Sequence, residues 1–365
     1  MHILHINLQD GWRGGESQIS FLMLELKKKP IRQTLVCKQG SQLEQFAIDN
    51  SINYLSLKLG ILSTFINAKK IATFVRTNKV DIMHCNESIG LGIAVWSRIA
   101  FKNKAKIILH RHVVFPIKGM LSKLVKYSPK YNDKVICISS EGEKVIRDTT
   151  YNTNITIIPS MTDVNYDYKN ERVLEQLGID MSKKIVGYFA AFTPEKDHYS
   201  FLKAAQIISA ACAEVHFVLA GSGDLEEQIK TYAAELNLTN KTSFLGFVPQ
   251  AQRLIPEIDV LLFTSTKEGL GSTILEFFVA KKPVVTVKNG GSEDLVFDGK
   301  TGFICELKDA DCMAEKTLRL LNEPELVNEI TENAYTHALE NFSFKSVTEK
   351  IYAVYQEVIA AKDKL

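Results

Sequence analysis

The chain has 365 residues, of which 45% are hydrophobic and 24% charged, and this composition is typical of a globular protein with two domains of ordinary size. No apolar run approaches the roughly 18 residues of a membrane-spanning helix, and the N-terminus resembles a strand, not a secretory signal, so we expect a cytoplasmic protein. The six cysteines form no CxxC pair, which favours reduced core thiols over a metal site or a disulfide framework.

Charge is divided unevenly along the chain. Residues 1–165 hold 23 Lys and Arg against 12 Asp and Glu, whereas residues 166–365 hold 21 against 30. The basic half favours an anionic partner, such as a lipid surface or a phosphorylated acceptor. The alternative is an imbalance of solvated surface charges without a function.

The first predicted strand, residues 3–8, is followed by a glycine-rich loop at residues 9–16 and a helix over residues 17–28. Glycines ahead of a helix N-terminus let backbone amides approach an anion closely. The dinucleotide spacing Gly-x-Gly-x-x-Gly is absent, so a nicotinamide cofactor is not supported. A simple structural turn is the alternative for this loop.

Short strands and helices then alternate to the end of the first half. Strands are predicted at residues 34–37, 82–85, 106–109, 134–138 and 155–158, with helices at residues 62–77 and 89–100. The strand at 106–109 leads into His110-Arg111-His112, at the end where an open α/β sheet places ligand groups. A histidine there can exchange a proton or donate a hydrogen bond near neutral pH, although a structural role is the alternative for either one.

Residues 116–134 form a basic, amphipathic segment. Met120, Leu121 and Leu124 share one helical face, and lysines occupy the rest. Such a helix can lie on a membrane surface, or it can pack its apolar face on the sheet.

A polar linker at residues 162–184 precedes the second half, where the sheet restarts at residues 185–189. Lys196 follows at a loop–helix junction, where a lysine is a suitable point charge for a diphosphate. The next strand, residues 216–220, ends at Gly221, and a helix over residues 225–236 is followed by the segment at residues 242–248.

The stretch from Asp259 to Val296 reads as strand, loop, helix, strand and loop. Glu268 lies just before the helix, and Ser272 or Thr273 can cap that helix. An acid at a helix N-terminus would compete with a phosphate for the free amides, so a sugar hydroxyl is the expected partner of Glu268. Glu276 lies among apolar residues of the helix, where a carboxylate is costly to bury without a hydrogen-bond donor. The hydroxyl groups of a ribose would be suitable donors. The alternative places Glu276 on the polar face of an amphipathic helix.

This stretch resembles the donor-site signature of retaining glycosyltransferases of family 4. The resemblance rests on Glu268-Gly269-Leu270-Gly271, Leu275-Glu276-Phe277, Pro283-Val284-Val285 and Gly290-Gly291. It covers essentially the whole chain and is strongest in the second half.

The resemblance implies an α/β protein of the GT-B fold, with two Rossmann-like, doubly wound domains and an interdomain cleft. The expected domains are an acceptor-side domain at residues 1–165, a donor domain at residues 166–341, and a C-terminal helix, residues 342–365, that returns to the first domain.

The resemblance also implies roles for individual residues. His112, Glu268 and Lys196 are the expected catalytic residues, with His110 as the alternative histidine. The expected donor-binding residues are Gly14, Gly15, Lys196, Gly221, Phe247, Val248, Glu268, Leu270, Gly271, Ser272 and Glu276. The family usually places an arginine shortly after the strand glycine, but Gly187 is followed here by Tyr188 and Phe189; Arg13 is a candidate for the second phosphate cation.

The expected activity is transfer of a sugar from a UDP- or GDP-sugar to a glycan or lipid-linked acceptor, with retention and without a metal or cofactor. We expect a role in surface polysaccharide or lipopolysaccharide synthesis, peripheral contact of the basic half with an anionic membrane at its inner face, and no nucleic-acid partner. A nucleotide-sugar epimerase of the same fold and a non-catalytic nucleotide-sugar-binding protein are the alternatives.

Overall fold

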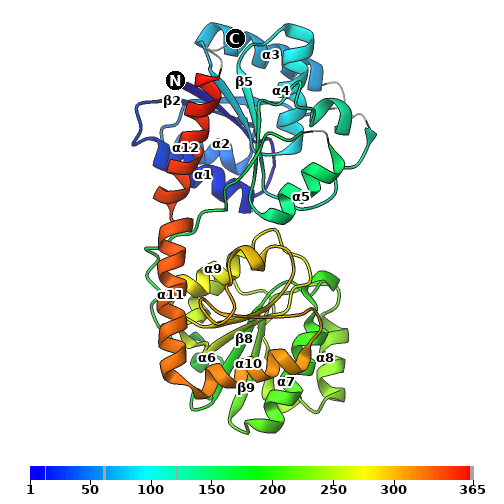
Figure 1. The fold of residues 1–365 in the computed structure, drawn as a ribbon, viewed down its shortest axis with the longest axis vertical. Helices are drawn as coiled ribbons and strands as arrows, with labels where there is room; N and C mark the ends of the chain where they lie inside the picture. The colour runs from blue at the N-terminus through cyan, green and yellow to red at the C-terminus, as the bar shows by residue number, and fades with distance from the viewer. Residues whose placement is uncertain (13, 61–62, 121, 151, 362–365) are drawn as a thin grey trace. The chain divides into compact units, whose positions relative to one another are not determined.

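A computed structural model of the chain describes residues 1–12, 14–60, 63–120, 122–150 and 152–361. The chain forms two compact units (Figure 1). Unit 1 contains Met1–Met161 and the C-terminal segment that starts at Phe344, and unit 2 contains Thr162–Ser343. These divisions lie a few residues from the boundaries expected from the sequence. Arg13, the candidate phosphate cation, lies outside the described residues.

Unit 1 contains a seven-stranded parallel sheet with the order β3-β2-β1-β4-β5-β6-β7. Its strands are β1 (His2–Ile6), β2 (Arg32–Lys38), β3 (Tyr54–Leu57), β4 (Ile82–Cys85), β5 (Lys106–Arg111), β6 (Lys134–Cys137) and β7 (Ile155–Ile157). The central strands are buried on both faces and mostly apolar, as expected for a parallel sheet that helices cover on two sides, although His5, His84 and His110 lie among them.

Helices cover both faces of this sheet. They are α1 (Gly14–Leu26), α2 (Gln42–Asp49), α3 (Ser63–Asn78), α4 (Ser88–Phe101), α5 (Ser140–Thr149) and α12 (Phe344–Ala360). Side chains on one face, such as Ile3, Ile82 and Ile108, form a core with α1 and α12, and those on the other face pack against α3 and α4. The helices α1 and α12 lie side by side, blue and red in Figure 1.

Unit 2 contains a six-stranded parallel sheet with the order β10-β9-β8-β11-β12-β13. Its strands are β8 (Lys184–Phe189), β9 (Val215–Ala220), β10 (Thr242–Phe244), β11 (Val260–Phe263), β12 (Val284–Val287) and β13 (Phe303–Cys305). Its α-helices are α6 (Val173–Gln176), α7 (His198–Ala211), α8 (Glu226–Glu235), α9 (Ser272–Val279), α10 (Ala310–Asn322) and α11 (Pro324–Phe342).

The connections place α7 and α9 on opposite faces of the second sheet. Parallel strands are joined by right-handed crossovers. The step from β8 to β9 runs toward one edge of the sheet and the step from β11 to β12 runs toward the opposite edge, so the two crossover helices lie on different faces. The helix α10 packs against α7, and α11 packs against α9. Both units are therefore doubly wound, as predicted.

Several predicted elements need correction. The helix α1 begins at Gly14, so Gly14 and Gly15 lie in its first turn and not in the preceding loop. The short elements α2 and β3 were not predicted. The predicted helix over residues 116–134 is also wrong: its described part contains one π-helical turn, Ser122–Lys126, where Pro116, Gly119 and Pro129 interrupt a regular helix.

The cysteine prediction is wrong for one pair. Cys305, at the end of β13, and Cys312, in the first turn of α10, form a disulfide with a Cα–Cα distance of 6.0 Å. The fold, not a short spacing motif, brings them together. The other four cysteines are free. In the described part of the chain, no helix combines the length and apolar character needed to cross a membrane.

Candidate functional site

The second sheet reverses its strand order between β8 and β11. In open α/β sheets, ligands bind beyond the carboxyl ends of the strands at such a reversal. The loop after β8 carries Lys196, and the loop after β11 carries Glu268. The topology therefore brings two predicted site residues to one place, although 72 positions separate them.

The backbone around Lys196 is held by buried hydroxyl groups. The Lys196 carbonyl accepts hydrogen bonds from Tyr188 Oη at 2.7 Å and from Thr264 Oγ1 at 3.2 Å. The next residue, Asp197, has a left-handed backbone and caps α7 through the Ser200 amide. These contacts fix the point from which the Lys196 side chain extends.

Lys196 and Glu268 form an ion pair. Lys196 Nζ lies 2.5 Å from Glu268 Oε1, and the two side chains are 22% and 15% exposed. Removing either partner from such a pair leaves a poorly solvated charge. Within the protein, Glu268 therefore pairs with a lysine that was not predicted as its partner, and the expected sugar hydroxyl stays a prediction.

Two loops meet behind this pair. A Cβ on Gly291 would lie 2.9 Å from the Leu270 amide nitrogen and 3.0 Å from the Glu268 carbonyl oxygen, so only glycine fits without a backbone shift. The Asn289 side chain joins the same loops, because its Oδ1 accepts from the amides of Gly291 and Ser292 and its Nδ2 donates to the Ser265 carbonyl. The glycine-rich stretch is therefore required by close packing.

The N-terminus of α9 lacks a side-chain cap. Gly271 occupies the N-cap position with φ +94°, so the prediction that Ser272 or Thr273 caps the helix is wrong. Ser272 is exposed, whereas Leu270 is buried. Uncapped amides at a helix N-terminus carry partial positive charge and can bind an anion.

A pocket of about 500 Å³ lies over the carboxyl ends of β8, β9 and β10 and against α9. Four predicted donor-binding residues line it: Gly221, Phe247, Val248 and Glu276. Gly221 is required there, because a Cβ would overlap the Ala190 carbonyl oxygen. Ala190, Ser222, Gln252 and Thr273 also line the pocket. They were not predicted as donor-binding residues, because none of them carries a charge.

Glu276 is the acidic residue of this pocket. Its side chain is partly buried and has no hydrogen-bond or ion-pair partner within the described ranges. Burial raises the pKa of this carboxyl group to about 7. A buried carboxylate without a protein partner is suited to accept hydrogen bonds from a ligand.

The pocket contains no cation of its own. None of the described residues that line it is a lysine or an arginine. Ala190 and Ala191 stand shortly after the strand glycine, Gly187, where the family resemblance leads one to expect an arginine. Lys196, on the loop after β8, therefore stays the predicted phosphate cation of unit 2.

The carboxyl edge of unit 1 has different chemistry. His110 lies in β5 and is 4% exposed, whereas His112 lies just beyond the strand and is partly exposed. Their ring centroids are 4.1 Å apart, and burial lowers the pKa of His112 to about 4. A Cβ would meet nothing within 4 Å at Gly14 or Gly15.

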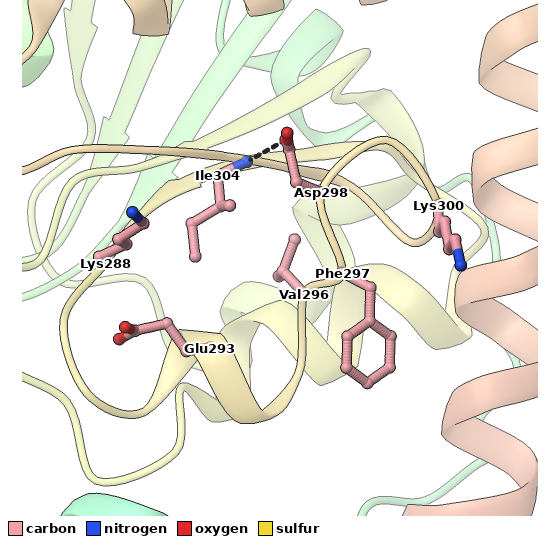
Figure 2. Close-up of a pocket in the computed structure, with 7 residues that line it drawn as sticks. All are labelled: Lys288, Glu293, Val296, Phe297, Asp298, Lys300 and Ile304. Atoms are coloured by element: carbon pink, nitrogen blue, oxygen red, sulfur yellow. Dashed lines mark hydrogen bonds between the residues drawn. The ribbon is translucent and has the colours of Figure 1, made fainter.

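Two other hollows contain none of the predicted site residues. One hollow, of about 550 Å³, is lined mainly by the segment that links β12 to β13. Lys288 and Glu293 lie on one side of it and Lys300 on the other (Figure 2). The other, of about 660 Å³, lies between β3 and α3 in unit 1. Within the ranges described above, no group of three or more His, Cys, Asp or Glu is arranged to hold a metal ion.

Family models match both halves of the chain. Residues 12–166 match the model described as Glycosyltransferase Family 4, and residues 169–337 match the model described as glycosyl transferases group 1. The two matches follow each other and span most of the chain.

Curated relatives align with most of the chain at low identity. The N-acetyl-alpha-D-glucosaminyl L-malate synthase of Bacillus anthracis is 23% identical over 80% of this chain and 78% of that protein. The UDP-Gal:alpha-D-GlcNAc-diphosphoundecaprenol alpha-1,3-galactosyltransferase of Escherichia coli is 22% identical over 90% of this chain and 89% of that protein.

Solved structures establish the architecture. A glycosyltransferase from Rickettsia africae ESF-5 is similar with a TM-score of 0.84 and 20% identity over 98% of both chains. Anabaena HepE, solved in complex with UDP, is similar with a TM-score of 0.83 and 20% identity over 98% of this chain and 100% of that one. The predicted GT-B fold is confirmed.

Proposed function

Since the chain is a glycosyltransferase of group 1, we propose that it is a retaining, hexosyltransferase-type enzyme that transfers a sugar from a nucleotide sugar to a glycan or lipid-linked acceptor. The observation that carries this proposal is the pocket lined by Glu276, which lies on the same sheet edge as the Lys196–Glu268 pair. We place the reaction in the synthesis of a cell-surface polysaccharide or lipopolysaccharide.

The nucleoside occupies the Glu276 pocket in this proposal. Glu276 accepts hydrogen bonds from the ribose diol, which gives its carboxylate the partner it lacks in the protein. The segment with Phe247 and Val248 lies against the base, and Gly221 permits close approach of the backbone. UDP is the preferred nucleotide, because the structural neighbour HepE binds UDP; GDP is the alternative.

The diphosphate engages Lys196 and the N-terminus of α9. When the donor binds, its charge competes with Glu268 for Lys196, and Glu268 becomes free to accept a sugar hydroxyl. The uncapped amides from Gly271 and Ser272 face the charge that develops on the leaving diphosphate. Positioned dipoles of this kind stabilise a transition state without a metal or cofactor.

His112 is the proposed partner of the donor sugar, and Gly14 and Gly15 are the proposed backbone contacts of the diphosphate. Glu268 and His112 orient the sugar, while the acceptor attacks from the face that the diphosphate leaves. A covalent glycosyl–Glu intermediate is not part of this proposal, because a pair of carboxylates flanking the bond is not evident.

The acceptor side is basic and partly apolar. Phe115 and Met120 are 67% and 75% exposed, and they lie near Lys118 and Lys123 in the segment between β5 and β6. Apolar side chains beside lysines suit an anionic membrane surface. We propose a cytoplasmic enzyme that contacts the inner face of the membrane peripherally and uses a lipid-linked acceptor, the acceptor type in the name of the Escherichia coli relative.

Product analysis tests this function. The protein is incubated with UDP- and GDP-sugars and short glycan or polyprenyl-phosphate acceptors, and the products are identified by NMR. A new glycoside with the donor's anomeric configuration supports the proposal. Inversion at a carbon of the free donor would indicate the epimerase, binding without turnover would indicate a binding protein, and a glycoside of the opposite configuration would exclude retention.

A further inference from the structure

A row of aromatic side chains connects the C-terminal helix with His112 in unit 1. The Tyr355 hydroxyl of α12 lies 2.6 Å from His84 Nδ1 on β4. The His84 ring stacks on His110 with a centroid distance of 5.4 Å and an interplanar angle of 8°, and His110 contacts His112 at 4.1 Å. The row therefore begins under a helix and ends beyond β5.

Polar atoms in this row lack partners. His84 Nε2 and both ring nitrogens of His110 and His112 are buried without a hydrogen bond inside the described ranges. Each unsatisfied buried polar group costs about 1–3 kcal/mol, whereas leucine or phenylalanine in the same places would carry no such cost. Packing alone does not explain three adjacent imidazoles.

One hydrogen bond anchors the row. Tyr355 is fully buried, and its hydroxyl bonds to one specific nitrogen of His84. If the hydroxyl donates, His84 carries its proton on Nε2, so the bond selects one tautomer and one ring orientation. The nearly parallel stacking then fixes His110, on which His112 rests.

The groups around the row are themselves histidines. His5 of β1 lies 5.5 Å from His84. Burial, and then the neighbouring His5 and His112, lower the pKa of His84, while burial, His112 and His84 lower the pKa of His110. A histidine is often oriented by a carboxylate or a backbone carbonyl. Here a tyrosine hydroxyl and ring stacking occupy that place.

We infer that Tyr355, His84 and His110 are positioning residues, which hold His112 in the orientation in which it meets the donor sugar. The inference rests on the proposed function for the role of His112, but the positioning itself is a property of the free protein. It assigns α12 a role in the site, in addition to covering the apolar face of the first sheet.

The test compares the full-length protein with Tyr355→Phe and Tyr352→Phe. Tyr352 is a matched control, because it lies on α12, is only partly buried and contacts Lys29 instead of the row. Histidines labelled with ¹⁵N report their tautomers through long-range ¹H–¹⁵N spectra. We expect one dominant tautomer for His84 and one set of His112 ring signals in the wild type and Tyr352→Phe, and an averaged His84 tautomer with shifted His112 signals in Tyr355→Phe.

Kinetics supply the second measurement. A misplaced catalytic group lowers the rate of chemistry without weakening nucleotide binding, so Tyr355→Phe should lower kcat about tenfold and leave the KM for the donor unchanged. Circular dichroism of all variants verifies that they fold.

The outcomes separate the two proposals. A His112 spectrum that is the same in Tyr355→Phe and wild type overturns the inference, even if activity falls. Full transfer activity in His112→Ala would instead remove His112 from the proposed mechanism, while the spectra of the ligand-free protein would still decide whether the row positions it.

Discussion

Both sheets reverse their strand order at one point, between β1 and β4 in unit 1 and between β8 and β11 in unit 2. In unit 2 this edge presents an ion pair, an unpartnered carboxyl group and glycines at points of close packing. In unit 1 it presents buried imidazoles and glycines with open space around them. The same topology thus places a partly buried ion pair and an unpartnered carboxyl group at one edge, and buried imidazoles beside a more exposed ion pair, Lys38 with Asp10, at the other.

The largest effect is expected at Lys196. Lys196→Ala removes the cation assigned to the diphosphate and should lower kcat about 10²–10³-fold, as expected when one electrostatic stabiliser of a transition state is lost. Lys288→Ala is the control, because Lys288 pairs with Glu306 outside the nucleotide pocket. Equal activity of the two variants in steady-state assays would remove Lys196 from the mechanism.

A substitution at Gly221 should lower stability strongly. Gly221→Ala places a Cβ on the Ala190 carbonyl oxygen, and the backbone at φ +154° disfavours a side chain. Overpacking of this kind costs about 1–3 kcal/mol. Urea unfolding measures the change, and an unchanged midpoint would show that the tip of β9 is more adaptable than its packing indicates.

Glu276 should make stability depend on pH. Its pKa rises from 4.5 to about 7 in the folded protein, so the free energy of unfolding should fall as pH rises from about 4.5 through 7 and then level off. Glu276→Gln lacks this loss and should be more stable than wild type by about 1–3 kcal/mol at pH 8, with no gain at pH 4.5. Urea titrations at both pH values measure the difference. If Glu276→Gln were equally more stable than wild type at pH 4.5 and pH 8, the effect would come from packing and not from ionisation.

The smallest effect is expected in the first turn of α1. Gly15→Ala should raise the free energy of unfolding by up to about 1 kcal/mol, because the position is helical and a Cβ meets no neighbour. If the diphosphate requires close approach to this backbone, donor KM should rise although stability does not fall. An unchanged KM would mean that glycine is not needed here for donor binding.

The sequence predicted the repeating strands well because buried parallel strands are short, branched and apolar, as at Val260–Phe263 and Val284–Val287. The sequence was less informative about features that depend on contacts between residues far apart in the chain or on the detailed backbone geometry. Only the folded chain shows that Glu268 pairs with Lys196, that Gly271 occupies the N-cap of α9, or that Cys305 meets Cys312. The short edge strand β3 gave no strong periodic signal.

Candidate site residues could be selected from the sequence by their charge or motif, whereas the residues that support them could not. Glu268, Glu276 and Lys196 differ chemically from their surroundings and therefore stand out in the sequence. Tyr188, Thr264 and Ala190 resemble ordinary strand and loop residues, and their positions relative to Lys196 or the pocket depend on which strands become neighbours. Such supporting contacts require the structure.

The most direct test of the central claim is calorimetric titration of UDP into wild type, Glu276→Ala and Glu227→Ala at pH 8. Glu227 is an exposed carboxylate on α8 outside the pocket and serves as the control. Wild type and Glu227→Ala should bind UDP alike, and Glu276→Ala should bind at least about tenfold more weakly, because the loss of a hydrogen-bonded charged group costs about 1.5–3 kcal/mol. Equal binding by all three proteins would contradict the assignment of Glu276 to the ribose, and no binding of UDP or GDP to the wild type would contradict the nucleotide pocket itself.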